Sequence, residues 1–184
     1  MTTIILIIIG ILILYTIFVY NSIISLQNQV KNSFSGIDVQ LKRRNDLIPN
    51  LIETVKGYAK HEKDVLENVT NMRTQMISAM DTGYKSQIAK TQDMLSETLK
   101  SLFAVSENYP DLKANQNFLE LQNQIATTED QIAASRRIYN SNTMVYNSKL
   151  QVFPNNLLVK IFNFKEYEFF KATAQEKENI KVEL

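Results

Sequence analysis

Residues 30–51 read VKNSFSGIDVQLKRRNDLIPNL, and apolar side chains recur in this stretch at alternating intervals of four and three residues. This spacing places them on one stripe of an α-helix, and such a stripe is normally buried against other helices. The stripe continues to Met76 and is interrupted by Arg44 and Glu62. Its positions are Val30, Phe34, Ile37, Leu41, Arg44, Ile48, Leu51, Val55, Tyr58, Glu62, Val65, Val69, Met72 and Met76. The stretch therefore predicts an all-α fold.

Pro49 lies within this stripe. A proline inside a helix removes one backbone hydrogen bond and usually kinks the helix. Because the stripe keeps its phase on both sides of Pro49, we expect one kinked helix rather than two separate helices. A turn between Gly57 and Glu62 would end this first helix, and the residues up to Met76 would then belong to a second one.

Two further helices are expected after residue 80. The sequence Asp81-Thr82-Gly83-Tyr84 favours a turn, because glycine readily takes a positive φ angle. A third helix is predicted from about Ser86 to Ser106, and Pro110 follows a break in the helical pattern. Asn115 is a suitable N-cap for a last long helix that Pro154 would end.

These helices have short connections, which favour antiparallel packing within one chain. We therefore predict an antiparallel four-helix bundle over residues 27–153. The last helix has a row at seven-residue spacing, formed by Ile125, Ile132, Tyr139, Tyr146 and Phe153, and a polar companion row that includes Thr128, Ser135 and Asn142. A coiled coil between chains is the alternative, because a heptad stripe can serve either arrangement.

The residues before the bundle form an uncharged apolar segment. Residues 4–20 read IILIIIGILILYTIFVY, and the first charged side chain is Lys31. A helix over residues 4–26 would be roughly 34 Å long, enough to cross a hydrocarbon core of ~30 Å. A cleaved signal peptide would carry positive side chains before the apolar run and small residues at a cleavage site. We therefore predict a transmembrane anchor over residues 1–26, with residues 4–26 contacting the lipid bilayer.

The basic residues predict how this anchor is oriented. No lysine or arginine precedes the apolar segment, whereas Lys31, Lys42, Arg43 and Arg44 follow it. The positive-inside rule then predicts an N-terminus outside the cell and a bundle in the cytoplasm.

Several segments resemble one protein family in order along the chain. They are residues 37–44 (IDVQLKRR), 46–51 (DLIPNL), 55–62 (VKGYAKHE), 104–115 (AVSENYPDLKAN), 137–140 (RIYN) and 153–157 (FPNNL). Together they resemble the LemA family of bacterial membrane proteins, which usually has tryptophan where Phe34 stands and often alanine where Ser106 stands. The resemblance implies a single-span protein of the bacterial inner membrane, a four-helix bundle and no established enzymatic activity.

The sequence contains few of the residue patterns that form catalytic, metal or nucleic-acid-binding sites. His61 is the single histidine and cysteine is absent, so a metal site would consist almost wholly of carboxylates. The sequence has no phosphate-binding glycine loop and no nucleophile elbow. A net charge of +1 gives no basic footprint for nucleic acid. We therefore expect no catalytic residues, no cofactor, no metal and no nucleic-acid partner.

Candidate interaction residues fall in three places. Arg44 either pairs with a carboxylate of another helix or contacts an anion or partner together with Lys42 and Arg43. The connection after residue 106 holds Tyr109 and Asp111, which either face a partner or form a turn packed on the bundle.

The third place is residues 154–171, which interleave aromatic and basic side chains. Phe162, Phe164, Phe169 and Phe170 suit a membrane interface or a docking strip. The alternative is that this segment folds back over the end of the bundle. Residues 172–184 are predicted to be a polar mobile tail.

Taken together, the sequence favours a membrane-anchored helical scaffold or adaptor, or a self-assembling envelope protein, that acts by protein interaction. Its expected partners are the bilayer and either a second copy or another membrane protein. The alternative is a module that binds a small ligand or a lipid in the bundle core or along the polar row of the last helix.

Overall fold

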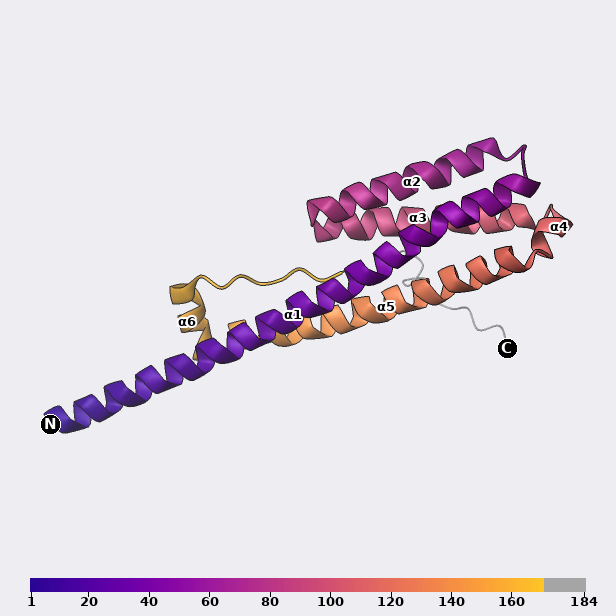
Figure 1. Cartoon of the computed structure of the whole chain (residues 1–184). Coiled ribbons are helices and arrows are strands. Elements are labelled where there is room, and N and C mark those ends of the chain that lie inside the picture. The colour runs from indigo at the N-terminus through magenta and orange to yellow at the C-terminus, as the bar shows by residue number, and fades with distance from the viewer. Residues whose placement is uncertain (171–184) are drawn as a thin grey trace, which may run out of the picture. The chain divides into compact units, whose positions relative to one another are not determined.

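The computed structural model describes residues 1–170, which contain six helices and no strand (Figure 1). The helices are α1 (Thr2–Tyr58), α2 (Lys63–Thr82), α3 (Lys85–Ser106), α4 (Pro110–Lys113), α5 (Gln116–Gln151) and α6 (Asn155–Phe162). The predicted all-α class is confirmed. The predicted mobile tail at residues 172–184 lies outside the described residues.

The helix α1 passes through Pro49 without a break and ends at Tyr58, inside the predicted turn region. Proline has no N–H, so the carbonyl of Asn45, four residues earlier, loses its usual helical donor. The Nε of Arg73 on α2 donates to this carbonyl at 2.9 Å. The side chain of a neighbouring helix thus compensates for the proline, and α1 remains one helix from the apolar segment into the bundle.

Ile37–Ala134, together with Phe170, form one compact unit. It contains the later half of α1, the helices α2, α3 and α4, and the first half of α5, so four long helices lie side by side (Figure 1). The turn between α2 and α3 contains Gly83 at φ 68°, a left-handed conformation that glycine adopts without strain. Most of the heptad stripe is buried here, but Tyr58 is 43% exposed, and Leu66 is buried where the stripe predicted Val65. The buried side chains include Ile37, Leu41, Ile48, Leu51, Val55, Val69, Met72 and Met76.

A second compact unit contains Met1–Gly36 and Ser135–Phe169. In this unit the start of α1 packs together with the end of α5, with α6 and with the residues that follow α6. Phe34, the position where the resembled family usually has tryptophan, packs edge-on against Tyr139 with ring centroids 5.9 Å apart. The predicted single bundle over residues 27–153 is therefore shared between two units.

The apolar start of α1 exposes large side chains on every face between Ile4 and Phe18. Among the described residues, α1 is the one helix long and apolar enough to cross a membrane. The buried helix of a soluble core would instead hide these side chains. The N-terminal part of α1 is consistent with the predicted membrane anchor.

Two details differ from the sequence-based expectation. The last long helix ends at Gln151, before Pro154, and the predicted core residue Phe153 lies beyond this end with 79% of its surface exposed. The short helices α4 and α6 were not predicted. Both begin at or directly after a proline, where the fixed φ angle of that residue suits a helix start.

Candidate interaction surfaces

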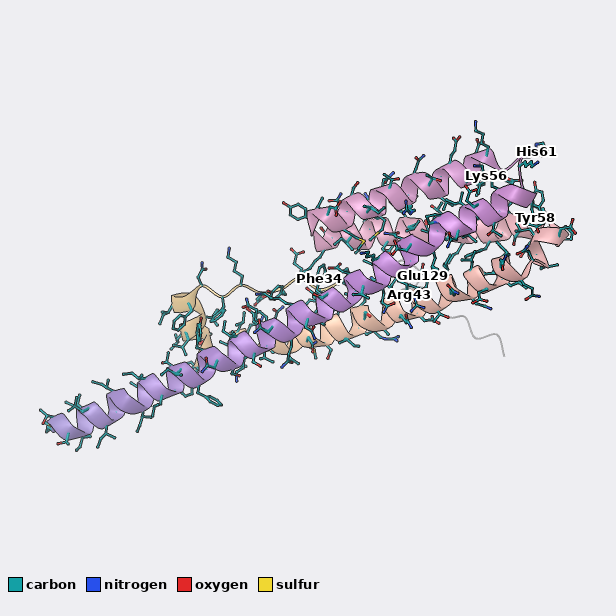
Figure 2. The ribbon with its side chains drawn as sticks, viewed as in Figure 1. Phe34, Arg43, Lys56, Tyr58, His61 and Glu129 are labelled. Atoms are coloured by element: carbon teal, nitrogen blue, oxygen red, sulfur yellow. The ribbon has the colours of Figure 1, made fainter. Side chains whose placement is uncertain are left out.

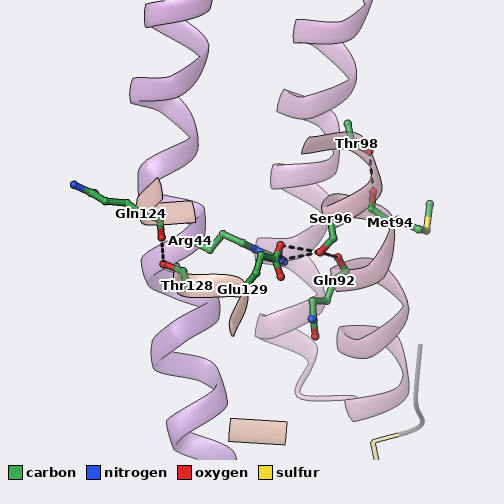
Figure 3. A network of polar contacts seen from close by, with 8 residues as sticks. All are labelled: Arg44, Gln92, Met94, Ser96, Thr98, Gln124, Thr128 and Glu129. Carbon is green, nitrogen blue, oxygen red and sulfur yellow. Dashed lines mark hydrogen bonds and ion pairs between the residues drawn. The ribbon is translucent and has the colours of Figure 1, made fainter. Parts of the chain in front are cut away.

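Arg44 occupies the interruption of the apolar stripe and is fully buried. Its Nη1 forms an ion pair with Oε1 of Glu129 on α5 and donates to Oγ of Ser96 on α3 at 3.0 Å (Figure 3). The Ser96 hydroxyl donates in turn to Glu129 at 2.8 Å. Of the two readings of Arg44, the structure supports pairing with a carboxylate of another helix.

The electrostatics of this network follow from its burial. Removal from water lowers the pKa of the Arg44 guanidinium, and the carboxylates of Glu129 and Asp93 oppose this lowering. The Nε and Nη2 atoms of Arg44 are buried and have no hydrogen-bond partner among the described residues. The guanidinium is therefore held mainly by one carboxylate, whose own side chain is 31% exposed.

Lys42 and Arg43 do not join this network. Both are exposed on α1, whereas Arg44 is buried. Successive helical residues point about 100° apart, which separates three adjacent basic residues around the helix. The expectation that they form one contact with an anion or partner is wrong for Arg44.

The connection after α3 packs on the bundle. The Tyr109 hydroxyl donates to Oε1 of Glu62 at 3.1 Å, and partial removal from water and this hydrogen bond both raise the pKa of Tyr109. Asn115 caps α5, as predicted, because its side chain accepts from the backbone N–H of Phe118 at 3.0 Å. Its amide also donates to Tyr58, which lies near His61 at the end of α1 (Figure 2). Asp111 is exposed.

The chain after α6 folds back along α5. Asn147 holds Tyr167 by two hydrogen bonds, since its amide donates to the Tyr167 carbonyl at 2.9 Å and its oxygen accepts from the Tyr167 N–H at 3.0 Å. The hydroxyls of Tyr139 and Tyr146 donate to the carbonyls of Glu168 and Lys165. These bonds support the folded-back reading for residues 165–168.

The four aromatic residues of this segment have different surroundings. The rings of Phe162 and Phe164 pack against Tyr20 of α1, with centroids 5.0 and 5.7 Å apart. Half of the Phe169 side chain is exposed, whereas Phe170 is buried. Phe170 is thus not available to an external partner, and Phe169 and part of Phe162 remain accessible.

A second row on α5 was missed by the sequence analysis. Ile138, Val145 and Val152 lie seven residues apart and are 58%, 47% and 49% exposed, and Val152 directly follows the last residue of α5. The buried row of Tyr139 and Tyr146 lies one residue further along the sequence and has the same spacing. The seven-residue spacing of Ile138, Val145 and Val152 could have revealed this exposed row from the sequence.

The polar row of α5 supplies few free groups. The Thr128 hydroxyl donates to the Gln124 carbonyl of its own helix at 2.7 Å (Figure 3). The Asn142 amide donates to the carbonyl of Gln29 at 3.5 Å. Across residues 1–170, no three His, Asp or Glu side chains gather as a metal site would require.

Comparison with known proteins relates the chain to one protein family. The model of the LemA family matches residues 33–184. The chain is also similar to Protein LemA of Metamycoplasma hominis, with 30% identity over 112 residues. The aligned region covers 60% of this chain and 49% of that protein, so the chain spans about half the length of this curated relative.

Proposed function

The chain belongs to the LemA family, and from this premise we propose that it is a membrane-anchored helical scaffold that acts by protein interaction. The observation that carries the proposal is the exposed apolar row of Ile138 and Val145 on α5, with Val152 directly after the end of this helix. Apolar side chains repeated along one exposed side of a helix favour an interaction site, because covering them removes apolar area from water. The proposal assigns the chain no catalytic role, no cofactor and no nucleic-acid partner.

The composition of this row suits a second helix. Its three members are β-branched, and Ser141 and Ser148 lie between them on the same exposed side. β-Branched residues at one heptad position occur in parallel two-stranded coiled coils, and small residues let helices approach closely. A helix with a matching row would therefore cover it.

A second copy of the chain fits this requirement. Within its unit α5 runs along α1, because Tyr139 meets Phe34 and Asn155, just beyond α5, meets Tyr15. If α1 crosses the membrane, α5 stands along the membrane normal. Two copies in one membrane share their orientation, so equivalent residues of the two α5 helices meet about a two-fold axis.

Cysteine crosslinking tests this pairing. The chain has no cysteine, so Val145→Cys introduces the sole thiol. In membranes treated with a mild oxidant we expect a disulfide-linked dimer of twice 21.2 kDa. Arg137→Cys is the matched control, since it is exposed on the same helix about 80° away from Val145. Equal yields from both variants, or adducts with another protein alone, would overturn self-assembly.

The orientation of the anchor is part of the proposal. Lys160 and Lys165 are exposed in the segment that packs against Tyr20, near the C-terminal end of the apolar stretch, and they join Lys31 there. Basic residues at this end of the span support a bundle in the cytoplasm and an N-terminus on the outer face of the inner membrane.

An impermeant maleimide checks this orientation in whole cells. Thr3→Cys should be labelled from outside, whereas Tyr84→Cys, exposed in the bundle, should react after lysis alone. The reverse pattern would place the bundle outside the cell.

The ligand-binding alternative has weaker support. It was predicted in the bundle core or along the polar row of α5, and in that row the Thr128 and Asn142 side chains already donate to backbone carbonyls. The interaction role is therefore the one that the geometry favours.

A further inference from the structure

The short helix α6 turns an apolar row toward solvent. Leu157 and Ile161 lie one helical turn apart on α6, with 54% and 73% of their surfaces exposed, and Phe153, just before this helix, is 79% exposed. Asn155 on the opposite side of α6 is buried. Lys160 borders the exposed row. A soluble surface rarely concentrates three large apolar side chains in so short a segment.

Contacts fix where α6 lies along α1. The Tyr15 hydroxyl donates to Oδ1 of Asn155 at the start of α6, at 3.2 Å. At the other end of α6, the ring of Phe162 packs on Tyr20 with centroids 5.0 Å apart. The helix α6 therefore lies beside residues 15–20 of α1, within one compact unit (Figure 1).

The exposed apolar band of α1 ends beside α6, within residues 15–20. The band runs from Ile4 to Phe18, whereas Val19 and Ile23 are buried and contact protein. Fifteen helical residues span about 22 Å, which is less than the ~30 Å thickness of a hydrocarbon core. The rest of the span predicted over residues 4–26 therefore has protein beside it, and α1 and its neighbours together would supply the apolar surface there.

We infer that α6 is an interfacial helix that lies in the headgroup region of the bilayer. Phe153, Leu157 and Ile161 enter the outer part of the acyl chains, and Lys160 and Lys165 face the phosphates of anionic lipids. The occupant of this surface is lipid because the surface continues the apolar band of the anchor. This inference rests on the membrane-anchoring part of the proposed function.

Fluorescence quenching by brominated lipids tests this location. The chain has no tryptophan, so a substitution creates a single reporter. The full chain carrying Ile161→Trp is reconstituted in vesicles of phosphatidylcholine and phosphatidylglycerol, brominated at a shallow or a deep acyl carbon. Leu157→Trp is a second reporter on α6. Ile11→Trp, 61% exposed in the middle of the band, reports the span, and Tyr84→Trp, 70% exposed, reports water.

We expect shallow bromines to reduce the emission of both α6 reporters about twofold and to leave the Tyr84→Trp variant unchanged. Deep bromines should quench the Ile11→Trp variant most. Unquenched α6 reporters beside a quenched Ile11→Trp variant would overturn the interfacial location and leave the anchor intact. Blue-shifted but unquenched α6 reporters would mean that protein covers this surface, which also overturns it. An unquenched Ile11→Trp variant would instead refute the anchor itself, on which the inference rests.

Discussion

Arg44 shows how one residue can set the alignment of a bundle. It stands at a heptad position between Leu41 and Ile48, where an apolar side chain would pack as well. A buried ion pair adds little net stability compared with apolar packing, but breaking it leaves an uncompensated charge. Its partners Ser96 and Glu129 come from α3 and α5, so these contacts form only when three helices are in register.

Removing the guanidinium should therefore destabilise the bundle. We expect Arg44→Ala to lower the free energy of unfolding by about 3 kcal/mol, measured by denaturant titration in detergent. Glu129→Ala in the Arg44→Ala background should cost much less than it does alone, because the pair is already broken. Arg43→Ala is the exposed neighbouring control, with an expected change within about 0.5 kcal/mol. A loss from Arg44→Ala as small as that of the control would contradict the register role.

Asp38 offers a test by pH. Partial burial raises the pKa of its carboxyl above the ordinary value of 3.8. The charged form is thus disfavoured in the folded protein, and stability is lost as the pH rises through the raised pKa. Asp38→Asn should raise the melting temperature at pH 7, and this gain should vanish below pH 3.8, where both folded and unfolded wild-type protein bind the proton.

Circular dichroism melts at pH 7 and pH 3 measure this difference. Asp46→Asn, at an exposed aspartate of the same helix, is the control and should leave the melting temperature nearly unchanged. A destabilising effect of Asp38→Asn at pH 7 would mean that its carboxylate is stabilised by a partner.

Among the elements, α1 continues through a proline, and a neighbouring helix supplies a donor in place of the missing N–H. Pro49 leaves the Asn45 carbonyl without its helical donor, and Arg73 of α2 supplies a replacement. Hydrogen bonds to charged groups contribute about 1.5–3 kcal/mol. The bond also fixes α2 against α1 at the middle of the bundle.

A double-mutant cycle tests this compensation. Arg73→Ala should lower the free energy of unfolding by about 2 kcal/mol in the natural chain. In the Pro49→Ala background the restored N–H of residue 49 pairs with the Asn45 carbonyl, so the same substitution should cost clearly less. An equal loss in the free energy of unfolding in both backgrounds would show that Arg73 stabilises the protein through a contact other than the Asn45 carbonyl.

Much of the element order could be predicted from the sequence. The heptad stripe specified which faces of α1 and α2 are buried, and Gly83 and Asn115 marked a turn and a helix start through their own backbone preferences. The partner of Arg44 could not be predicted, because several helices carry carboxylates and spacing does not show which one faces it. The exposed row of α5 and the position of α6 beside Tyr15 and Tyr20 depend on tertiary contacts between residues far apart in the chain.

At the scale of the whole molecule, α1 and α5 each belong to both compact units. The unit that contains the apolar start of α1 also contains the exposed row of α5 and the exposed side of α6. We propose that this unit holds the protein in the membrane and pairs it with a second copy. The four-helix unit would then be presented in duplicate to the cytoplasm.

The mass of the purified protein tests self-assembly most directly. Light scattering of the detergent-solubilised wild type, corrected for bound detergent, should give twice the 21.2 kDa of one chain. Val145→Glu should give 21.2 kDa with an unchanged circular dichroism spectrum, because it places a charge on an exposed row and leaves the core intact. A monomeric wild type, together with no disulfide-linked dimer from Val145→Cys in membranes, would contradict the account.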